Sequence, residues 1–261
     1  MGLLLKEGID IDLIKTALIA FFSIGFLIVL INYLSFFKTR LPNYSFQLAG
    51  LIGNTSFLGI PIAIALLPTS TINLTIGFDL GTTLFAWIFG PLFLQKKKPS
   101  NTNLSFKELL KAVLNSPASR GIIGVFITYL FGLESVMGDY LWIPAKIVIV
   151  LAIIVVGTRL GIITNNKTNF FSFNKGIKYS IILKLLIFPL IIFFVSEVLN
   201  FDLNETSAVV LQAGTPSAVS TILMAEAYKT NQKIAATILF TTTLISIITI
   251  PLLANLIIIS Q

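Results

Sequence analysis

The sequence predicts an all-α protein that crosses a membrane several times. Of its 261 residues, 56% are hydrophobic and only 11% are charged, which gives a mean hydropathy of +0.95. Apolar runs long enough to span a bilayer recur along the chain. Two of these runs are interrupted near their middle by Gly, Pro and small polar residues. Together these observations predict a polytopic helical protein with two broken helices.

Eight spans are predicted from the apolar runs and from the charged or Gly/Pro/Asn-rich segments between them. Most are close to the roughly 20 residues that an α-helix needs to cross a bilayer, whereas the fourth is shorter. We expect the spans at 11–37, 46–68, 71–94, 118–133, 140–162, 176–199, 206–227 and 235–259.

The charges between the spans predict the orientation of the chain. Basic and acidic connections alternate, and the basic side is expected to be cytoplasmic, so both termini would lie outside the cytoplasm of a cell (inner) membrane. The two broken spans then run in opposite directions. The basic residues are Lys38, Arg40, Lys96, Lys97, Lys98, Lys107, Lys111, Lys167, Lys175, Lys229 and Lys233, and the acidic loop residues opposite are Glu134, Asp139, Asp202 and Glu205.

This orientation divides the chain into two inverted repeats. Residues 1–94 would form the first, with broken helix 46–68, and 95–117 a cytoplasmic linker. Residues 118–261 would form a second, five-helix repeat with broken helix 206–227. Because the first repeat is two helices shorter, we expect two amino-terminal helices to be missing, through either a missed upstream start codon or a shortened protein.

The two interruptions predict a binding site at mid-membrane. Breaking a helix in hydrocarbon frees backbone groups that cost several kcal/mol each unless they are satisfied, and secondary transporters use such breaks as substrate sites. The alternative is that Gly and Pro only kink the helices while Thr and Ser bond to their own turns. The predicted substrate-binding residues are Asn54, Thr55, Gly59, Pro61, Gln212, Gly214, Thr215, Pro216 and Ser217.

Two ionisable side chains lie within predicted spans. Asp79 lies about eight residues into the third span, and an intramembrane carboxylate is a candidate for accepting a coupling proton. Lys184 lies in the middle of the sixth span, and we expect it to pair with Asp79. The alternatives are an interfacial Asp79 and a Lys184 whose stem reaches the cytoplasmic end of its helix. Both residues are assigned to ion coupling.

The composition excludes several classes of protein. The chain has no Cys and no His, which excludes disulfides, thiolate chemistry, imidazole-dependent nucleophiles and most zinc sites. We expect no enzymatic activity, no metal and no cofactor. The net charge of +7 is explained by the loops between spans, so nucleic acid is not an expected partner.

The first interruption, GNTSFLGIP from Gly53 to Pro61, resembles a motif of the auxin efflux carrier family, which includes plant PIN proteins and many bacterial transporters. The resemblance continues through IGFDLGTTLF around Asp79, KLLIFPL from Lys184 to Leu190, and the segment from Gly214 to Leu253. It implies a fold of ten helices in two inverted repeats, similar to sodium/proton antiporters, in which the two broken helices cross.

The resemblance also implies a function. The last three helices of each repeat would form a transport domain, and the first two a scaffold that carries a dimer surface. Because half of that scaffold is missing here, a homodimer stays an open expectation. We expect a secondary active transporter, or permease, that moves a small organic anion across the lipid bilayer by alternating access, with proton coupling as one option. The alternatives are a sodium/proton antiporter-like cation exchanger and a non-transporting shortened paralogue.

Overall fold

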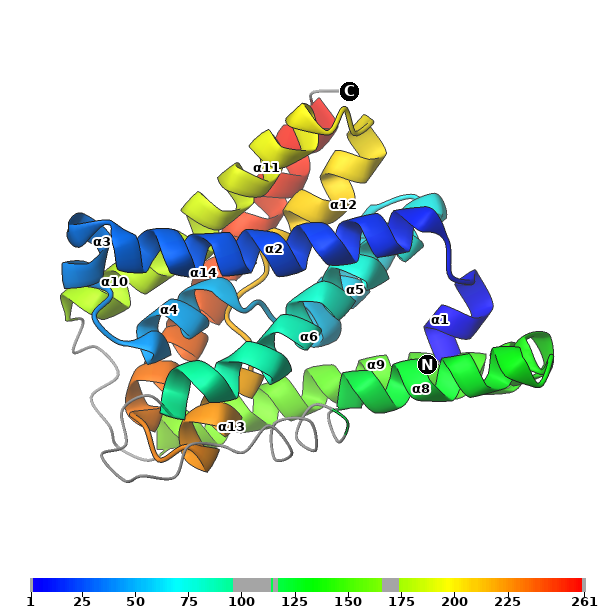
Figure 1. The fold of residues 1–261 in the computed structure, drawn as a ribbon, viewed down its shortest axis with the longest axis horizontal. Coiled ribbons are helices and arrows are strands. Elements are labelled where there is room, and N and C mark those ends of the chain that lie inside the picture. The colour runs from blue at the N-terminus through cyan, green and yellow to red at the C-terminus, as the bar shows by residue number, and fades with distance from the viewer. Residues whose placement is uncertain (1, 96–113, 115–116, 166–173, 260–261) are drawn as a thin grey trace.

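The computed structural model describes residues 2–95, 114, 117–165 and 174–259 (Figure 1). Its regular elements within these ranges are helical, and a single isolated bridge pairs Gly53 with Ser217. Among the described residues, four helical stretches are long and apolar enough to cross a membrane: Ile11–Tyr33, Thr69–Leu94, Lys175–Val198 and Gln232–Asn255. Shorter apolar helices cover Thr55–Leu66 and Ser119–Leu130. The predicted all-α polytopic membrane fold is confirmed.

The helices follow the predicted spans closely. They are α1 (Gly2–Glu7), α2 (Ile11–Tyr33), α3 (Ser35–Arg40), α4 (Tyr44–Leu51), α5 (Ile60–Leu66), α6 (Ile72–Gln95), α8 (Pro117–Leu130), α9 (Glu134–Asn165), α10 (Lys175–Ile182), α11 (Phe188–Val198), α12 (Leu203–Ala213), α13 (Ser220–Ala227) and α14 (Gln232–Ile259). Two π-helical turns, Thr55–Gly59 and Leu183–Ile187, and a 3-10 turn, Thr69–Thr71, complete the elements.

Two predicted spans have different boundaries in the structure. The first helix ends at Tyr33 rather than at 37, because Leu34 is extended and α3 begins after it. The fifth was predicted at 140–162, whereas α9 begins at Glu134, so Glu134 and Asp139 lie on a helix and not in a loop. Acidic residues near the amino end of a helix interact favourably with its dipole. The predicted linker lysines Lys96, Lys97, Lys98, Lys107 and Lys111, and Lys167, lie outside the described residues.

Helix α6 packs closely along α2 (Figure 1). Gly77 and Gly81 lie one turn apart on α6, and a side-chain carbon at either position would overlap the backbone carbonyl of Leu13 or of Ala17 on α2. Small residues at this spacing let two helix backbones approach each other within a membrane. Helix α2 therefore supports the helix that carries Asp79.

Helix α1 connects this pair of helices to α8 and α9. Leu4 and Leu5 of α1 share a buried cluster with Ile76 of α6 and Val125 of α8, and Met137 of α9 packs against it. Lys6 donates to Asp139 of α9 at 2.7 Å, with both side chains well exposed. An exposed ion pair contributes little to stability, so the apolar cluster is the main link.

Two helices are broken, as predicted. The first break separates α4 from the π turn at Thr55–Gly59, and the second separates α12 from α13. Each of the two π turns ends two residues before a proline, Pro61 in one case and Pro189 in the other. Proline cannot donate the backbone hydrogen bond of a regular helical turn, and a π bulge is one way in which a helix accommodates that loss.

Candidate functional site

The two broken helices pair with each other through their backbones. The N–H of Asn54 donates to the carbonyl of Pro216 at 2.7 Å, and the N–H of Ala218 donates to the carbonyl of Ile52 at 3.0 Å. Gly53 and Ser217 form an antiparallel bridge at the same place. Each broken helix therefore supplies hydrogen-bond partners for backbone groups that the other leaves free. The hydrocarbon of a membrane offers no such partners. We call residues 52–54 together with residues 214–218 the crossing.

Side chains of neighbouring segments pack tightly against two glycines of the first broken helix, Gly53 and Gly59. A side-chain carbon at Gly53 would lie 2.5 Å from Oγ1 of Thr215 and 2.9 Å from Nζ of Lys184. One at Gly59 would overlap the carboxamide of Gln212. Atoms this close must move apart, so substitution at either position would displace the side chains of Thr215, Lys184 or Gln212 that pack there.

Several buried polar atoms at the crossing have no hydrogen-bond partner among the described residues. They are Nδ2 of Asn54, Nε2 and Oε1 of Gln212, and Oγ of Ser217. Asn54 is 4% exposed, and the other two side chains are fully buried. A buried polar group without a partner costs about 1–3 kcal/mol. Such groups therefore indicate a place for water, an ion or a ligand.

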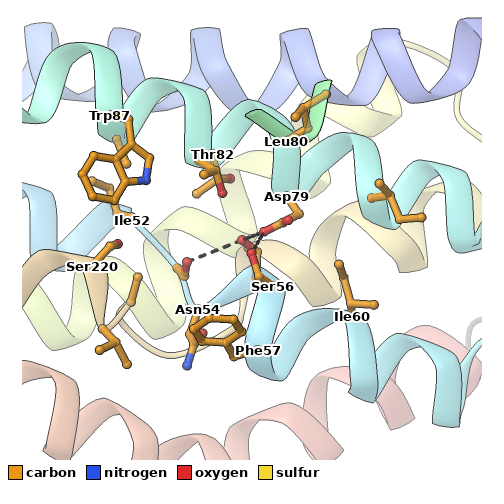
Figure 2. A pocket seen from close by; sticks show the side chains of 18 of the residues that line it. Ile52, Asn54, Ser56, Phe57, Ile60, Asp79, Leu80, Thr82, Trp87 and Ser220 are labelled. Atoms are coloured by element: carbon orange, nitrogen blue, oxygen red, sulfur yellow. Dashed lines mark hydrogen bonds between the residues drawn. The ribbon is translucent and has the colours of Figure 1, made fainter. Parts of the chain in front are cut away.

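A cavity of about 400 Å³ opens beside the first break (Figure 2). This volume lies within the range of small-molecule sites. The wall includes the aromatic rings of Phe57 and Trp87, which Figure 2 shows at different places around the cavity. The polar lining comes from the first break, α6 and the start of α13: Asn54, Thr55, Ser56, Asp79, Thr82, Thr83 and Ser220.

Asp79 connects α6 to the first break. Oγ1 of Thr55 and Oγ of Ser56 donate to the same carboxylate oxygen, Oδ1, at 2.5 and 2.6 Å. Figure 2 shows these bonds where Asp79 extends from α6 toward Ser56. Because an ionised carboxylate only accepts hydrogen bonds, two hydroxyl donors suit its charged form.

Lys184 lies on the first turn of the π helix that follows α10, and its side chain is fully buried. Its ammonium group donates to the carbonyl of Ala213 at 2.7 Å and lies 4.8 Å from the ring centroid of Phe188. Ala213 is the last residue of α12, and a helix carboxyl end carries partial negative charge that a cation stabilises.

The predicted pair between Lys184 and Asp79 is therefore wrong. Lys184 binds the end of α12, while Asp79 binds hydroxyl groups that follow the first break. The ammonium group of Lys184 lies next to Gly53, where a side chain would leave no room for it. The alternative in which Lys184 reaches the cytoplasmic end of its helix is also excluded, because its side chain has no exposure.

The half-helices that follow the two breaks both begin at the cavity. Thr55 starts the helical segment after the first break, and Ser220 starts α13 after the second. Both residues line the cavity. The amino end of a helix attracts negative charge through its dipole. At α13 the N–H groups of Thr221 and Ile222 already bond to the carbonyls of Ala218 and Val219. Asp79, in the same cavity, favours a cation or a proton.

The predicted binding residues fall into two groups. Asn54 and Thr55 line the cavity. The remaining seven lie at or next to the crossing, outside the cavity lining: Gly59, Pro61, Gln212, Gly214, Thr215, Pro216 and Ser217. The prediction that these residues bind substrate stays a prediction.

The cavity residues that were not singled out from the sequence include Ser56, Thr82, Thr83 and Trp87, together with Phe57 and Ser220. Helical spacing is the signal that finds three of them. Thr82 and Thr83 lie one turn beyond Asp79 on α6, and Trp87 lies two turns beyond it. Residues three or four apart share a helix face, so a functional Asp79 implies that these neighbours face the same space.

A helical membrane protein with two broken helices that cross beside a polar cavity has the architecture of a secondary transporter. A family model described as "Membrane transport protein" matches residues 3–254. The chain belongs to this family, the group of PIN and auxin efflux carriers that its motifs predicted.

The chain is also similar to an uncharacterized transporter of the archaeon Methanocaldococcus jannaschii. The two are 23% identical over 206 residues, which cover 78% of this chain and 65% of that relative. The match therefore spans less than two thirds of the relative's length.

Proposed function

We propose that the protein is a secondary active carrier that moves a small organic anion across the membrane by alternating access, together with a proton. The observation that carries this proposal is the composition of the cavity. The amino ends of both interrupted helices and the carboxylate of Asp79 line the same space of about 400 Å³.

The anion is supported by the donors around the cavity. Thr55 and Ser220 begin two half-helices there, and helix amino ends attract negative charge. The Nδ2 donor of Asn54 is buried and has no partner among the described residues. The rings of Phe57 and Trp87 in the wall would pack against an apolar body. A small carboxylate with a hydrophobic part suits these surroundings.

The proton is supported by the position of Asp79. A charged Asp79 would repel an anion in the same cavity, whereas a protonated Asp79 would not. The anion and the proton would therefore bind together. Protonation would also remove the negative charge that strengthens the hydrogen bonds from Thr55 and Ser56, while the neutral carboxyl keeps one oxygen that can accept them. This change would weaken the connection between α6 and the first break when the cavity is loaded.

The test is uptake of labelled mono- and dicarboxylates by proteoliposomes that contain the purified full chain. An inwardly directed proton gradient is expected to drive accumulation, and a sodium gradient at equal pH is not. Sodium-stimulated proton flux without anion uptake would overturn the proposal in favour of a cation exchanger. Saturable anion binding without any uptake, in a folded chain with a verified native start, would instead support a non-transporting paralogue.

The alternative function, cation exchange, has less support from the two charged side chains near the breaks, Asp79 and Lys184. Asp79 is the one carboxylate in the lining of the described cavity. At the carboxyl end of α12, where a bound cation would be favoured, the ammonium group of Lys184 is already present. The anion carrier is therefore the better supported of the two.

A further inference from the structure

A second cavity, of about 490 Å³, lies between α3 and the start of α10. The two helices lie side by side at one end of the molecule (Figure 1). Three of the residues that line the cavity are basic and none is acidic: Thr39, Arg40, Lys175, Lys178, Tyr179 and Ile182. We call this cavity the basic pocket.

The charges of the basic pocket are not neutralised within the part of the chain that the structure describes. No carboxylate there lies within ion-pair distance of Arg40, Lys175 or Lys178. Arg40 is nevertheless held in place. Its guanidinium donates to the carbonyl of Phe36 at 2.9 Å and lies 3.4 Å from the Phe36 ring centroid and 5.2 Å from that of Tyr179. A positioned guanidinium beside two free ammonium groups suits a phosphate group.

An exposed apolar stripe continues from the basic pocket along the same helical segment. Ile182, Leu186 and Leu190 follow Lys178 at intervals of four residues, and they are 44%, 57% and 47% exposed. Residues at this spacing lie on one helix face. The segment Lys175–Val198 is one of the stretches long enough to cross the bilayer, so the stripe faces acyl chains while the basic residues lie at head-group level.

We propose that the basic pocket binds the phosphate group of an anionic phospholipid, with an acyl chain along Ile182, Leu186 and Leu190. By the distribution of loop charges, this pocket lies on the cytoplasmic side, and basic pockets between membrane helices on that side bind anionic head groups. A free phosphate ion has the same chemistry as the head group, but it would gain nothing from the stripe. The proposal does not depend on the transported substrate.

The test is a lipid titration of the purified full chain in detergent, followed by native mass spectrometry. Phosphatidylglycerol is expected to bind at least tenfold more tightly than phosphatidylcholine. The double variant Lys175→Gln/Lys178→Gln is expected to weaken phosphatidylglycerol binding about 25-fold, because the loss of each lysine weakens it about fivefold. The matched control is Lys229→Gln/Lys233→Gln, which removes the same charge on the same predicted side but lies outside the pocket. It is expected to change binding less than threefold.

Equal losses in the two double variants would overturn the proposal, because net charge rather than the pocket would then explain binding. Displacement of the lipid by inorganic phosphate or glycerol phosphate at millimolar concentration would overturn the role of the lipid. Arg40→Lys, which keeps the charge but not the planar group, provides a further measurement if a double variant fails to fold. It is expected to weaken binding several-fold, and unchanged binding would count against a positioned guanidinium.

Discussion

The first and second breaks are each secured by one ionisable side chain, but the two contacts differ in kind. At the first break, Asp79 accepts hydrogen bonds from the hydroxyl groups of Thr55 and Ser56, beside an open cavity. At the second, Lys184 donates to the backbone carbonyl of Ala213 in a fully buried position. The first contact lies beside an open cavity, whereas the second is buried and joins Lys184 to a backbone carbonyl, which has no charge of its own.

This difference suggests different roles for the two charges. A buried ammonium group at the end of α12 offsets the negative end of the helix dipole, which a bound cation would otherwise do. We infer that Lys184 holds the carboxyl end of α12 at the second break, while Asp79 is the group that exchanges protons.

The largest effect is expected from Gly59→Val, which would disturb the packing of the first broken helix against Gln212 of α12. The new side chain would overlap the Gln212 carboxamide, and overpacking of this kind costs about 1–3 kcal/mol. We expect uptake to be lost and the melting temperature to fall. Gly157→Val is the control, because a side-chain carbon at Gly157 would meet no atom within 4 Å. Equal behaviour of the two variants would contradict the close approach.

Lys184→Met tests the contact that holds the end of α12. The variant is expected to fold, because it removes an unpaired buried charge and keeps a similar shape, but the Ala213 carbonyl loses its donor. We expect uptake in proteoliposomes to fall more than tenfold at every pH between 5 and 8. Lys146→Met, which removes an exposed lysine of α9, should keep uptake within twofold. A deficit relative to the wild type that is present only at low pH would show that Lys184 titrates, because the wild-type side chain would then already be neutral at high pH.

Asp79→Asn tests the proton-exchanging group. An amide can still accept from Thr55 and Ser56, but it cannot ionise. Wild-type affinity for the anion should rise as pH falls, because protonation removes the charge that repels the substrate. In Asp79→Asn this dependence should disappear, accumulation driven by a proton gradient should fall more than tenfold, and anion exchange without a gradient should stay within threefold. Proton-driven accumulation at the wild-type level would exclude Asp79 as the coupling group.

Asn54→Ala is expected to have the smallest effect of the four. The substitution removes the unpartnered Nδ2 donor at the cavity, and a hydrogen bond to a charged group is worth about 1.5–3 kcal/mol. We expect the KM for the anion to rise about tenfold, with little change in maximal rate or melting temperature. Asn255→Ala, at an exposed position on α14, is the control. Unchanged KM in Asn54→Ala would count strongly against the substrate site.

The spans and the two breaks could be predicted because they depend on local properties of the chain. Hydropathy marks a helix that must cross a bilayer, and Gly53, Pro61, Gly214 and Pro216 interrupt that signal where backbone geometry changes. The start of α9 was missed for a related reason. Glu134 and Asp139 read as loop residues by hydropathy alone, although charges also occur at the amino end of a helix that extends beyond the bilayer.

The partners of the buried charges could not be predicted in the same way. Opposite charge made Asp79 the natural partner for Lys184, but a backbone carbonyl at a helix end also stabilises an ammonium group and leaves no sign in the sequence. The contacts of Asp79 with Thr55 and of Lys184 with Ala213 join residues on different helices, 24 and 29 positions apart, so they depend on how the helices pack. Ser56 was missed because the motif alone does not show which of its hydroxyl groups meets another helix. The structure shows that both Thr55 and Ser56 donate to Asp79.

The backbone pairing of Gly53 with Ser217 has a consequence for biosynthesis. When residues 52–54 first enter the membrane, the segment that will accept and donate their hydrogen bonds lies about 160 residues further along the nascent chain. At typical rates of translation, that segment emerges on the order of ten seconds later. Until then the first interrupted helix needs water, lipid head groups or the insertion machinery as temporary partners. Final assembly of this protein within the bilayer must therefore wait until most of the chain has been made.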